Sequence, residues 1–249
     1  MSVSAGQKRK DGGIGETIRV VVHALIIALV IRTFLFQPFN IPSGSMMHTL
    51  LIGDFLFVSK YTYGYSRFSF PFSPPLFSGR LPGGWTPERG DVVVFRLPRE
   101  DSTDYIKRLI GLPGDRIQVI DGVLQINGTP VKRERLPDWV DPDSGQKVRQ
   151  WRETLPNGVS YETLDLQDRG MLDNTQVYVV PPDHYFMMGD NRDNSTDSRV
   201  LNQVGYVPFA NLVGKAQIIF FSVGEGEAAW QFWRWPWSVR WTRLFTIVR

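Results

Sequence analysis

The chain has 249 residues, of which 42% are hydrophobic and 13% aromatic, so it can bury a core and is not a disordered chain. Its net charge is only +3, and the sequence carries no signature of nucleic-acid binding. Cysteine is absent, which excludes disulfide bonds and thiolate metal ligands but leaves the redox compartment open.

The first predicted element is an apolar helix over residues 17–36, long enough to cross about 30 Å of hydrocarbon. Four basic residues lie before it or at its start: Lys8, Arg9, Lys10 and Arg19. No Lys or Arg lies between Arg32 and Lys60, so the positive-inside rule leaves the tail 1–16 in the cytoplasm and the rest of the chain outside. A cleaved signal peptide and an amphipathic core helix stay open as alternatives, but the bulky run 34–36 favours an uncleaved anchor.

Short β-rich runs separated by turn residues follow the helix, and they predict a mainly β domain. The runs are residues 55–58, 91–95, 105–110, 116–120, 123–126, 176–180, 185–188 and 216–223. The clearest unit is a hairpin turning at Asp121-Gly122, because this pair readily adopts the positive φ angles of a tight turn. Residues 37–135 and 171–225 form the predicted β-rich domain.

Three segments stand apart from this pattern. Residues 136–170 are polar, mixed in charge and without sustained periodicity, which indicates an inserted subdomain. Residues 61–87 are rich in aromatic residues, proline and glycine and contain no acid, and the tail 226–249 interleaves tryptophan with arginine. Both are candidates for a bilayer interface, and ordinary core packing of aromatic side chains is the competing interpretation.

Two residues with catalytic chemistry follow the apolar helix. Ser45 lies in the stretch 41–47, directly after the helix, and Lys107 lies in the stretch 104–108. A serine hydroxyl is a weak nucleophile until a base removes its proton, and a neutral lysine amine can be that base. This order predicts a serine/lysine hydrolase at a membrane surface.

A third motif is the polar segment 189–199, which is too rich in Asp, Asn and Ser for the interior of a strand. A calcium loop of the EF-hand type is disfavoured, because the glycine position would hold Ser195 or Ser198 and the glutamate position Leu201 or Val204. A turn-rich structural loop is the simplest alternative.

Taken together, these motifs resemble those of the bacterial type I signal peptidases. The matching stretches are residues 43–46 directly after the anchor, 105–108 with 111–115, and 189–199. Each is suggestive alone, and the three in this order are specific. The resemblance covers nearly the whole chain outside the two tails, the aromatic segment and the insertion.

The resemblance implies a role for each matching residue. Ser45 would be the nucleophile, Lys107 the general base, and Ser43 with the backbone N–H of Ser45 the oxyanion hole. Ser195 would orient the lysine by a hydrogen bond. Asp197 and Arg199 would form a supporting ion pair beside the site. Six residues would line shallow pockets for small side chains one and three residues before the scissile bond: Ile41, Pro42, Met46, Leu50, Tyr105 and Ile106.

This chemistry requires a Lys107 that is largely neutral near pH 7, whereas an ordinary lysine has a pKa of about 10.4. Burial among apolar neighbours would lower that pKa, and Arg108 would have to point to the other face of its strand. A Ser/His mechanism is the competing hypothesis. His48 lies three residues from Ser45, where the family often has proline, and neither His23 nor His184 lies in a motif.

Our prediction is a mainly β protein in which an N-terminal transmembrane helix precedes an antiparallel β-sheet catalytic domain with a small inserted subdomain. The resemblance implies a serine endopeptidase that removes signal peptides from exported preproteins at the outer, periplasmic face of the bacterial cytoplasmic membrane. It would meet the bilayer and, transiently, the export machinery, with no metal, cofactor or nucleic acid. The alternatives are a non-catalytic, membrane-tethered β module that binds extended peptides, and a Ser/Lys processing peptidase of narrow specificity.

Overall fold

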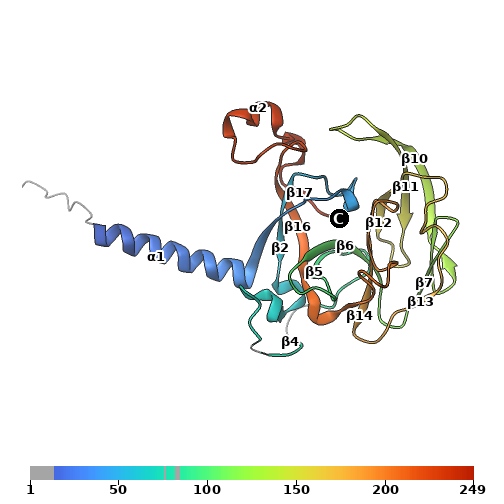
Figure 1. The fold of residues 1–249 in the computed structure, drawn as a ribbon, viewed down its shortest axis with the longest axis horizontal. Coiled ribbons are helices and arrows are strands. Elements are labelled where there is room, and N and C mark those ends of the chain that lie inside the picture. The colour runs from blue at the N-terminus through green and yellow to red at the C-terminus, as the bar shows by residue number, and fades with distance from the viewer. Residues whose placement is uncertain (1–13, 76, 82–84) are drawn as a thin grey trace, which may run out of the picture.

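The computed structural model describes residues 14–75, 77–81 and 85–249, and one long helix projects from its β-rich body (Figure 1). This helix, α1, spans Ile14–Val30 and continues as a wider turn, η1, over Ile31–Leu35. Phe36, predicted to end the helix, instead opens strand β1 (Phe36–Asn40). Residues 1–13 of the predicted cytoplasmic tail, including Lys8, Arg9 and Lys10, lie outside the described residues.

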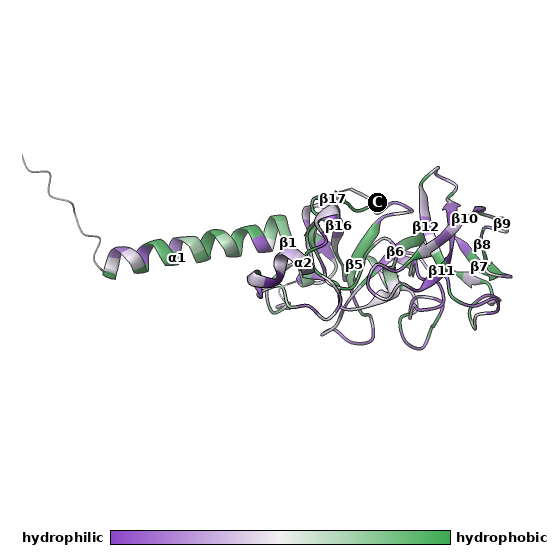
Figure 2. Cartoon of the chain, turned by 90° about the horizontal axis from the view of Figure 1, so that it is seen from above, coloured by the Kyte–Doolittle hydropathy of each residue, from purple (hydrophilic) through white to green (hydrophobic). Residues whose placement is uncertain are grey.

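The helix is apolar around its circumference over most of its length, as Figure 2 shows, and none of the residues of α1 is buried. Such a helix needs apolar surroundings on all sides rather than one packing partner. Among the described residues, Ile14–Leu35 is the one stretch that is long and apolar enough to cross a membrane.

The body is built on an eight-stranded sheet in which every pairing is antiparallel. Its order is β1, β2 (Asp54–Ser59), β16 (Leu212–Ser222), β5 (Val92–Arg96), β6 (Asp104–Gly111), β14 (His184–Met188) and β15 (Val207–Pro208), and β17 (Thr246–Ile247) pairs with β16. The order places β16, from late in the chain, between two early strands. The predicted fold class is confirmed.

The predicted hairpin is formed by β7 (Arg116–Ile120) and β8 (Val123–Ile126), with Asp121 at φ 48° and Gly122 at φ 74°. Two short strands complete a four-stranded sheet, β9 (Thr129–Pro130) and β13 (Tyr178–Val179). Two more, β3 (Tyr65–Ser66) and β4 (Arg80–Leu81), pair inside the aromatic segment, and a short helix, α2 (Trp235–Ser238), lies in the C-terminal tail.

The polar segment predicted as an insertion folds into a separate three-stranded sheet of β10 (Lys132–Val140), β11 (Lys147–Thr154) and β12 (Ser160–Asp165). No residue of β10 is buried. Polar pairs hold the neighbouring strands together, such as Arg152 with Glu162 across β11 and β12. β10, which has no buried face, lacks the apolar alternation that usually signals a strand, and in β11 and β12 the buried positions include polar residues such as Gln150, Glu153 and Thr163.

Candidate active site

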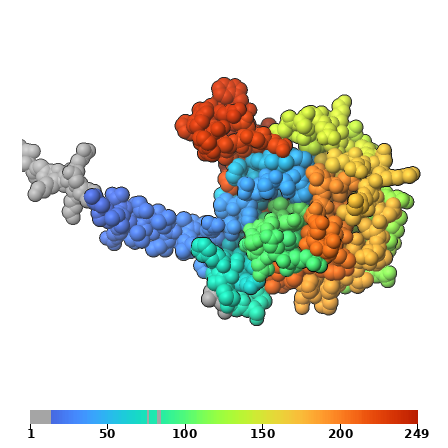
Figure 3. Space-filling view, viewed as in Figure 1, coloured from blue at the N-terminus to red at the C-terminus, as the bar shows by residue number. Residues whose placement is uncertain are grey.

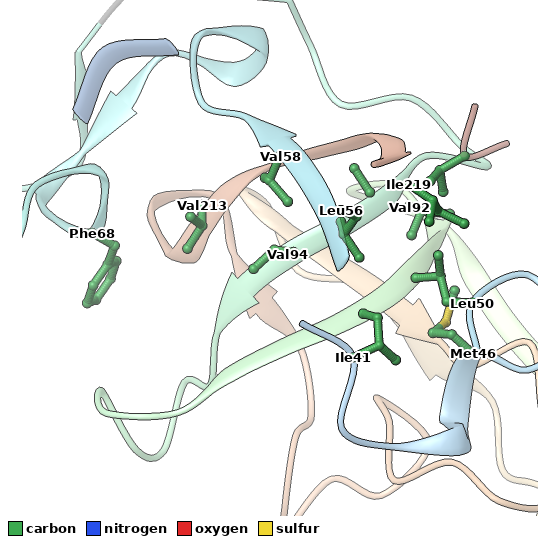
Figure 4. Close-up of a cluster of buried hydrophobic side chains, with 12 residues drawn as sticks. Ile41, Met46, Leu50, Leu56, Val58, Phe68, Val92, Val94, Val213 and Ile219 are labelled. Atoms are coloured by element: carbon green, nitrogen blue, oxygen red, sulfur yellow. The ribbon is translucent and has the colours of Figure 1, made fainter. Parts of the chain in front are cut away.

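Ser45 lies in a single turn, η2 (Gly44–Met46), that follows β1. The turn is held by the core: Met46 and Leu50 are fully buried in a cluster with Leu56 and Val92 (Figure 4). Met46 and Leu50, predicted to line the substrate pockets, pack into the core and are not among the residues that line the cleft beside Ser45. Their burial positions the serine turn instead.

Lys107 lies on β6 and reaches the serine. Its Nζ is 2.5 Å from Ser45 Oγ and donates to the Ile106 carbonyl at 2.9 Å. The side chain is almost excluded from water, and this burial lowers the pKa of Lys107 to about 8, although the charges of Asp197 and Asp190 oppose the shift. About one Lys107 in ten is then neutral at pH 7, against fewer than about one in a thousand for an ordinary lysine.

Arg108, the next residue along β6, does not line the cleft and is completely buried. Its guanidinium binds Asp190 through two bonds, Nε to Oδ1 at 2.8 Å and Nη2 to Oδ2 at 2.6 Å. Thr49 donates to the same carboxylate at 2.6 Å. A buried charge is tolerated when it is paired in this bidentate way, and the pair joins β6 to the polar segment 189–199 and to the chain just after Ser45.

Asn191 holds the serine turn through two bonds, and its role was not predicted. Its backbone N–H donates to the Ser45 carbonyl and its side-chain Nδ2 donates to the Gly44 carbonyl, each at 3.1 Å. In a trans peptide the Gly44 carbonyl and the Ser45 N–H point in opposite directions, so the side-chain bond turns this N–H away from Asn191. The signal for this role was present, since Asn191 lies within a matched motif.

Gly189 explains how the polar segment approaches so closely. A Cβ at this position would lie 2.5 Å from the Ser45 carbonyl oxygen and 2.2 Å from Ser195 Oγ, so there is no room for a side chain. Asp197 accepts from the Gly189 N–H at 3.0 Å and pairs with Arg199 at 2.8 Å. Burial alone would raise the pKa of Asp197, but the guanidinium of Arg199 and this N–H hold it below its usual value.

The two remaining predicted serines lie near Ser45 with different contacts. Ser43 Oγ is 3.4 Å from Ser45 Oγ. Ser195 Oγ is buried and makes no hydrogen bond with any described residue, so the expected bond to Lys107 is not formed in this structure. The lysine is already bonded to Ser45 and to a backbone carbonyl.

Ser45 and Lys107 face a cleft of about 390 Å³. Its other lining residues are Phe39, Asn40, Ile41, Pro42, Ser43, Val94, Thr103, Asp104, Tyr105, Ile106, Asn194 and Thr196. Four of the six predicted substrate residues are among them. Phe39 was missed although it is two residues before Ile41 on an extended strand, and Asn194 and Thr196 were missed although they lie in a matched motif.

The cleft runs between two free strand edges. β1 is the outermost strand of the large sheet, and residues 104–107 of β6 pair only with β5, because β14 joins β6 from Arg108 onward. A strand edge offers unpaired N–H and C=O groups that an extended peptide can bind.

His48 is engaged outside the cleft. Its Nε2 lies 3.1 Å from Glu162 on β12, and it does not line the cleft. Burial lowers the pKa of His48, although Glu162 opposes this shift. His184 lies near the Pro182 carbonyl, at 2.7 Å, and His23 lies within α1.

The sequence profile of the family described as "Signal peptidase, peptidase S26" matches residues 14–221. The chain belongs to this family. It is 44% identical to a Signal peptidase I of Rickettsia typhi over 238 residues, 89% of each chain, and 44% identical to that of Rickettsia conorii over 240 residues, 89% of this chain and 88% of the relative. The crystal structure of a signal peptidase I from Enterococcus faecalis V583 is 28% identical, with a TM-score of 0.31, and covers 53% of this chain and 97% of that one. Membership confirms the predicted resemblance and the predicted enzyme class, a serine endopeptidase of the signal peptidase type.

Proposed function

We propose that the chain removes N-terminal signal peptides from exported preproteins, with Ser45 as the nucleophile and Lys107 as the general base. One observation carries this proposal: Lys107 Nζ lies 2.5 Å from Ser45 Oγ inside a cleft. The relatives named Signal peptidase I, at 44% identity over most of the chain, support the substrate class.

The reaction needs the lysine in its neutral form. As Ser45 Oγ attacks the scissile carbonyl carbon, Lys107 accepts the hydroxyl proton and then donates it to the leaving amine. The resulting acyl-enzyme is hydrolysed by a water that the same amine deprotonates. The Ser45 N–H, whose peptide Asn191 holds, and the Ser43 hydroxyl would bind the oxyanion; one such donor is worth about 10² to 10³ in rate.

The cleft suits an extended peptide with small side chains near the scissile bond. The free edges of β1 and β6 offer backbone hydrogen bonds on both sides. Ile41, Pro42, Tyr105 and Ile106 give the wall an apolar surface beside Ser45. We expect the small side chains beside the scissile bond to pack against this wall.

The location proposed is the bacterial cytoplasmic membrane, crossed once by Ile14–Leu35, with the N-terminus in the cytoplasm and the β body on the periplasmic face. The aromatic segment and the C-terminal tail lie on either side of the base of α1 (Figure 3). The tail exposes Trp230, Trp233, Trp237 and Trp241. Such tryptophans would contact the interface of the bilayer, and the export machinery would deliver preproteins there.

The proposal is tested with the full chain in detergent and a panel of exported preproteins, comparing wild type with Ser45→Ala, Lys107→Met and His48→Ala. We expect cleavage after a small-x-small site, identified by N-terminal sequencing, that the first two changes abolish and the third retains. Preproteins that bind but stay intact would instead identify a non-catalytic peptide-binding module. Cleavage of a single panel member would identify a narrow processing peptidase, and loss of activity in His48→Ala would assign the base to histidine.

A further inference from the structure

A second cavity, of about 270 Å³, lies where η1 meets the β body, and three cationic side chains line it. Arg32 comes from η1, Lys60 follows β2, and Arg96 ends β5. Two carboxylates, Asp101 and Asp104, share the wall. In Figure 3 the turquoise segment after β2 lies against the base of the blue helix. We call this cavity the Arg32–Lys60 pocket.

Lys60 is a buried cation without a carboxylate partner. Only 2% of its surface is exposed, and its Nζ donates to the Ser69 carbonyl at 2.6 Å. No described carboxylate lies within 4.0 Å of this ammonium. Burial and the charge of Arg32 lower the pKa of Lys60 to about 8, with Asp104 acting in the opposite sense. A buried ammonium with one acceptor leaves N–H donors available to a ligand in the cavity.

The carboxylates of the pocket are already engaged. Asp104 is paired with Arg96 at 3.1 Å, and Asp101 is paired with Arg67. Arg32 has no ion-pair partner among the described residues. The pocket therefore holds two cations, Arg32 and Lys60, that no carboxylate neutralises. An anion with several acceptor oxygens, such as a phosphate group, matches an arginine and a lysine that face one cavity.

The depth of the pocket points to the source of that phosphate. Arg32 lies in the last turn of Ile14–Leu35, at the outer end of the proposed membrane span. A long basic side chain at this depth reaches the headgroup layer, just outside the hydrocarbon. Phe70 and Phe72 also line the pocket, and Phe72 is fully exposed. The fully exposed ring of Phe72 at the mouth of this polar pocket could contact the apolar part of a lipid, which inorganic phosphate lacks.

We propose that the Arg32–Lys60 pocket binds the phosphate group of one phospholipid of the outer leaflet, with Arg32 and Lys60 as donors and Phe72 beside the lipid's apolar part. Arginine and lysine bind phosphate oxygens through charge-assisted hydrogen bonds, and basic side chains at a membrane surface are attracted to lipid headgroups. The proposal rests on the proposed membrane span and is independent of the peptidase chemistry. The bound lipid would fix the body against the membrane beside the cleft, since Asp104 lines both cavities.

The test is native mass spectrometry of the full chain released from a phosphate-free maltoside detergent and titrated with phosphatidylglycerol. Wild type should retain one lipid, and Lys60→Met and Arg32→Gln should each weaken its binding by about tenfold or more, the loss of one charge-assisted contact. Two matched controls should bind as wild type does. Arg19→Gln removes the arginine at the other end of the same helix, and Lys132→Met removes a lysine that is exposed on β10.

Three results would overturn the proposal. Diacylglycerol binding as tightly as phosphatidylglycerol would exclude phosphate recognition, and full competition by an equal concentration of inorganic phosphate would exclude a lipid as the source. Equal losses in Arg19→Gln and Arg32→Gln would mean nonspecific lipid around the helix. Arg32 is exposed, so Arg32→Gln keeps the test valid if Lys60→Met does not fold. Alkaline extraction from membranes reports separately on the span, and preprotein cleavage reports on the catalytic site.

Discussion

Lys107 and Lys60 are two buried lysines with the same altered acidity and different surroundings. Each is at most 4% exposed, and burial lowers the pKa of each to about 8. Lys107 Nζ donates to the hydroxyl of Ser45, whereas the hydrogen bond that Lys60 Nζ makes with a described residue goes to the carbonyl of Ser69. Burial makes an amine available at neutral pH, but a reactive hydroxyl within reach is what makes it a base.

The surroundings of the two lysines also differ, in how firmly neighbouring groups are held and in how much unpaired charge they carry. The cleft of Lys107 is supported by bonds from the segment 189–199 to the serine turn, which Asn191 holds at 3.1 Å. The Arg32–Lys60 pocket lies at the end of the apolar helix, and Arg32 on its wall adds positive charge that no described carboxylate pairs with. Rigid support suits proton transfer between fixed groups, and unpaired positive charge suits an anion.

Removing each amine gives the largest expected effect. Lys107→Met should lower kcat/KM for a preprotein by about 10³-fold or more, because Ser45 loses its base. Lys60→Met should instead show its main loss in phosphatidylglycerol binding. Steady-state cleavage and lipid titration of both variants measure the contrast. If Lys107→Met kept its activity within tenfold of wild type, Lys107 would not be the general base and would not differ from Lys60 in this respect.

The second-largest effect is expected when the ion pair that holds the segment 189–199 beside the cleft is removed. Arg192, inside the segment 189–199, is bound to Glu153 of β11 by two bonds, at 2.9 and 2.6 Å, and all three groups of the cluster with Tyr161 are buried. Arg192→Met should lower the free energy of unfolding by about 3 kcal/mol, because it removes both close charge-assisted bonds to the buried Glu153 carboxylate and leaves only the more distant Arg133, at 3.9 Å, as a cationic partner. Urea titration of the detergent-solubilised chain measures this loss.

Arg152→Met is the matched control for that change. Arg152 lies next to Glu153 on β11 and pairs with Glu162 at 3.1 Å, but its side chain is 46% exposed. An exposed pair contributes at most about 1 kcal/mol. If both variants lost the same stability, the inserted sheet would not be what anchors the segment beside Ser45.

A smaller effect is expected from Asn191→Ala, which deletes the bond to the Gly44 carbonyl. The Gly44–Ser45 peptide would then be held only by the more local bond from the Met47 N–H at 3.2 Å, so the Ser45 N–H would be less firmly directed and kcat should fall by about 10-fold with little change in KM. Stopped-flow and steady-state cleavage separate the two constants. Asn174→Ala, which alters an amide in an exposed turn, is the control. A rise in KM alone would show that Asn191 positions the substrate rather than the oxyanion donor.

How far the sequence predicts this molecule depends on whether a feature is local. The apolar N-terminal helix and the hairpin at Asp121-Gly122 follow from composition and turn chemistry, and both are present in the structure. The inserted sheet has no apolar alternation and could not be recognised. Its strands pair with their neighbours in the chain, as Thr154 does with Ser160, through polar side chains that give no apolar pattern. Arg192 binds Glu153 from a segment 39 residues away, a contact that the sequence of the insertion alone cannot reveal.

The site follows the same division. The motifs named Ser45 and Lys107 as partners, and the structure places their side chains together. Spacing alone could not tell that Met46 and Leu50 point into the core, because the short turn at Gly44–Met46 and the connection after it have no sustained periodicity. It could not find Lys60 either, whose burial depends on the chain after it folding back over its ammonium.

The last test measures the pH dependence of cleavage and of stability in phosphate-free detergent. We expect the first to depend on Lys107 alone and the second on both Lys107 and Lys60. Because only the neutral amine accepts a proton, kcat/KM should rise about tenfold per pH unit below pH 8 and level off above it, with the midpoint set by the pKa of Lys107 and unmoved in Lys60→Met. Stability depends on both residues: each folded pKa lies below the unfolded value of about 10.4, so the unfolded chain binds more protons and stability rises between pH 8 and 10.4. Either Lys→Met change should flatten that rise. A rate midpoint that moved in Lys60→Met would mean that the two amines titrate as one system.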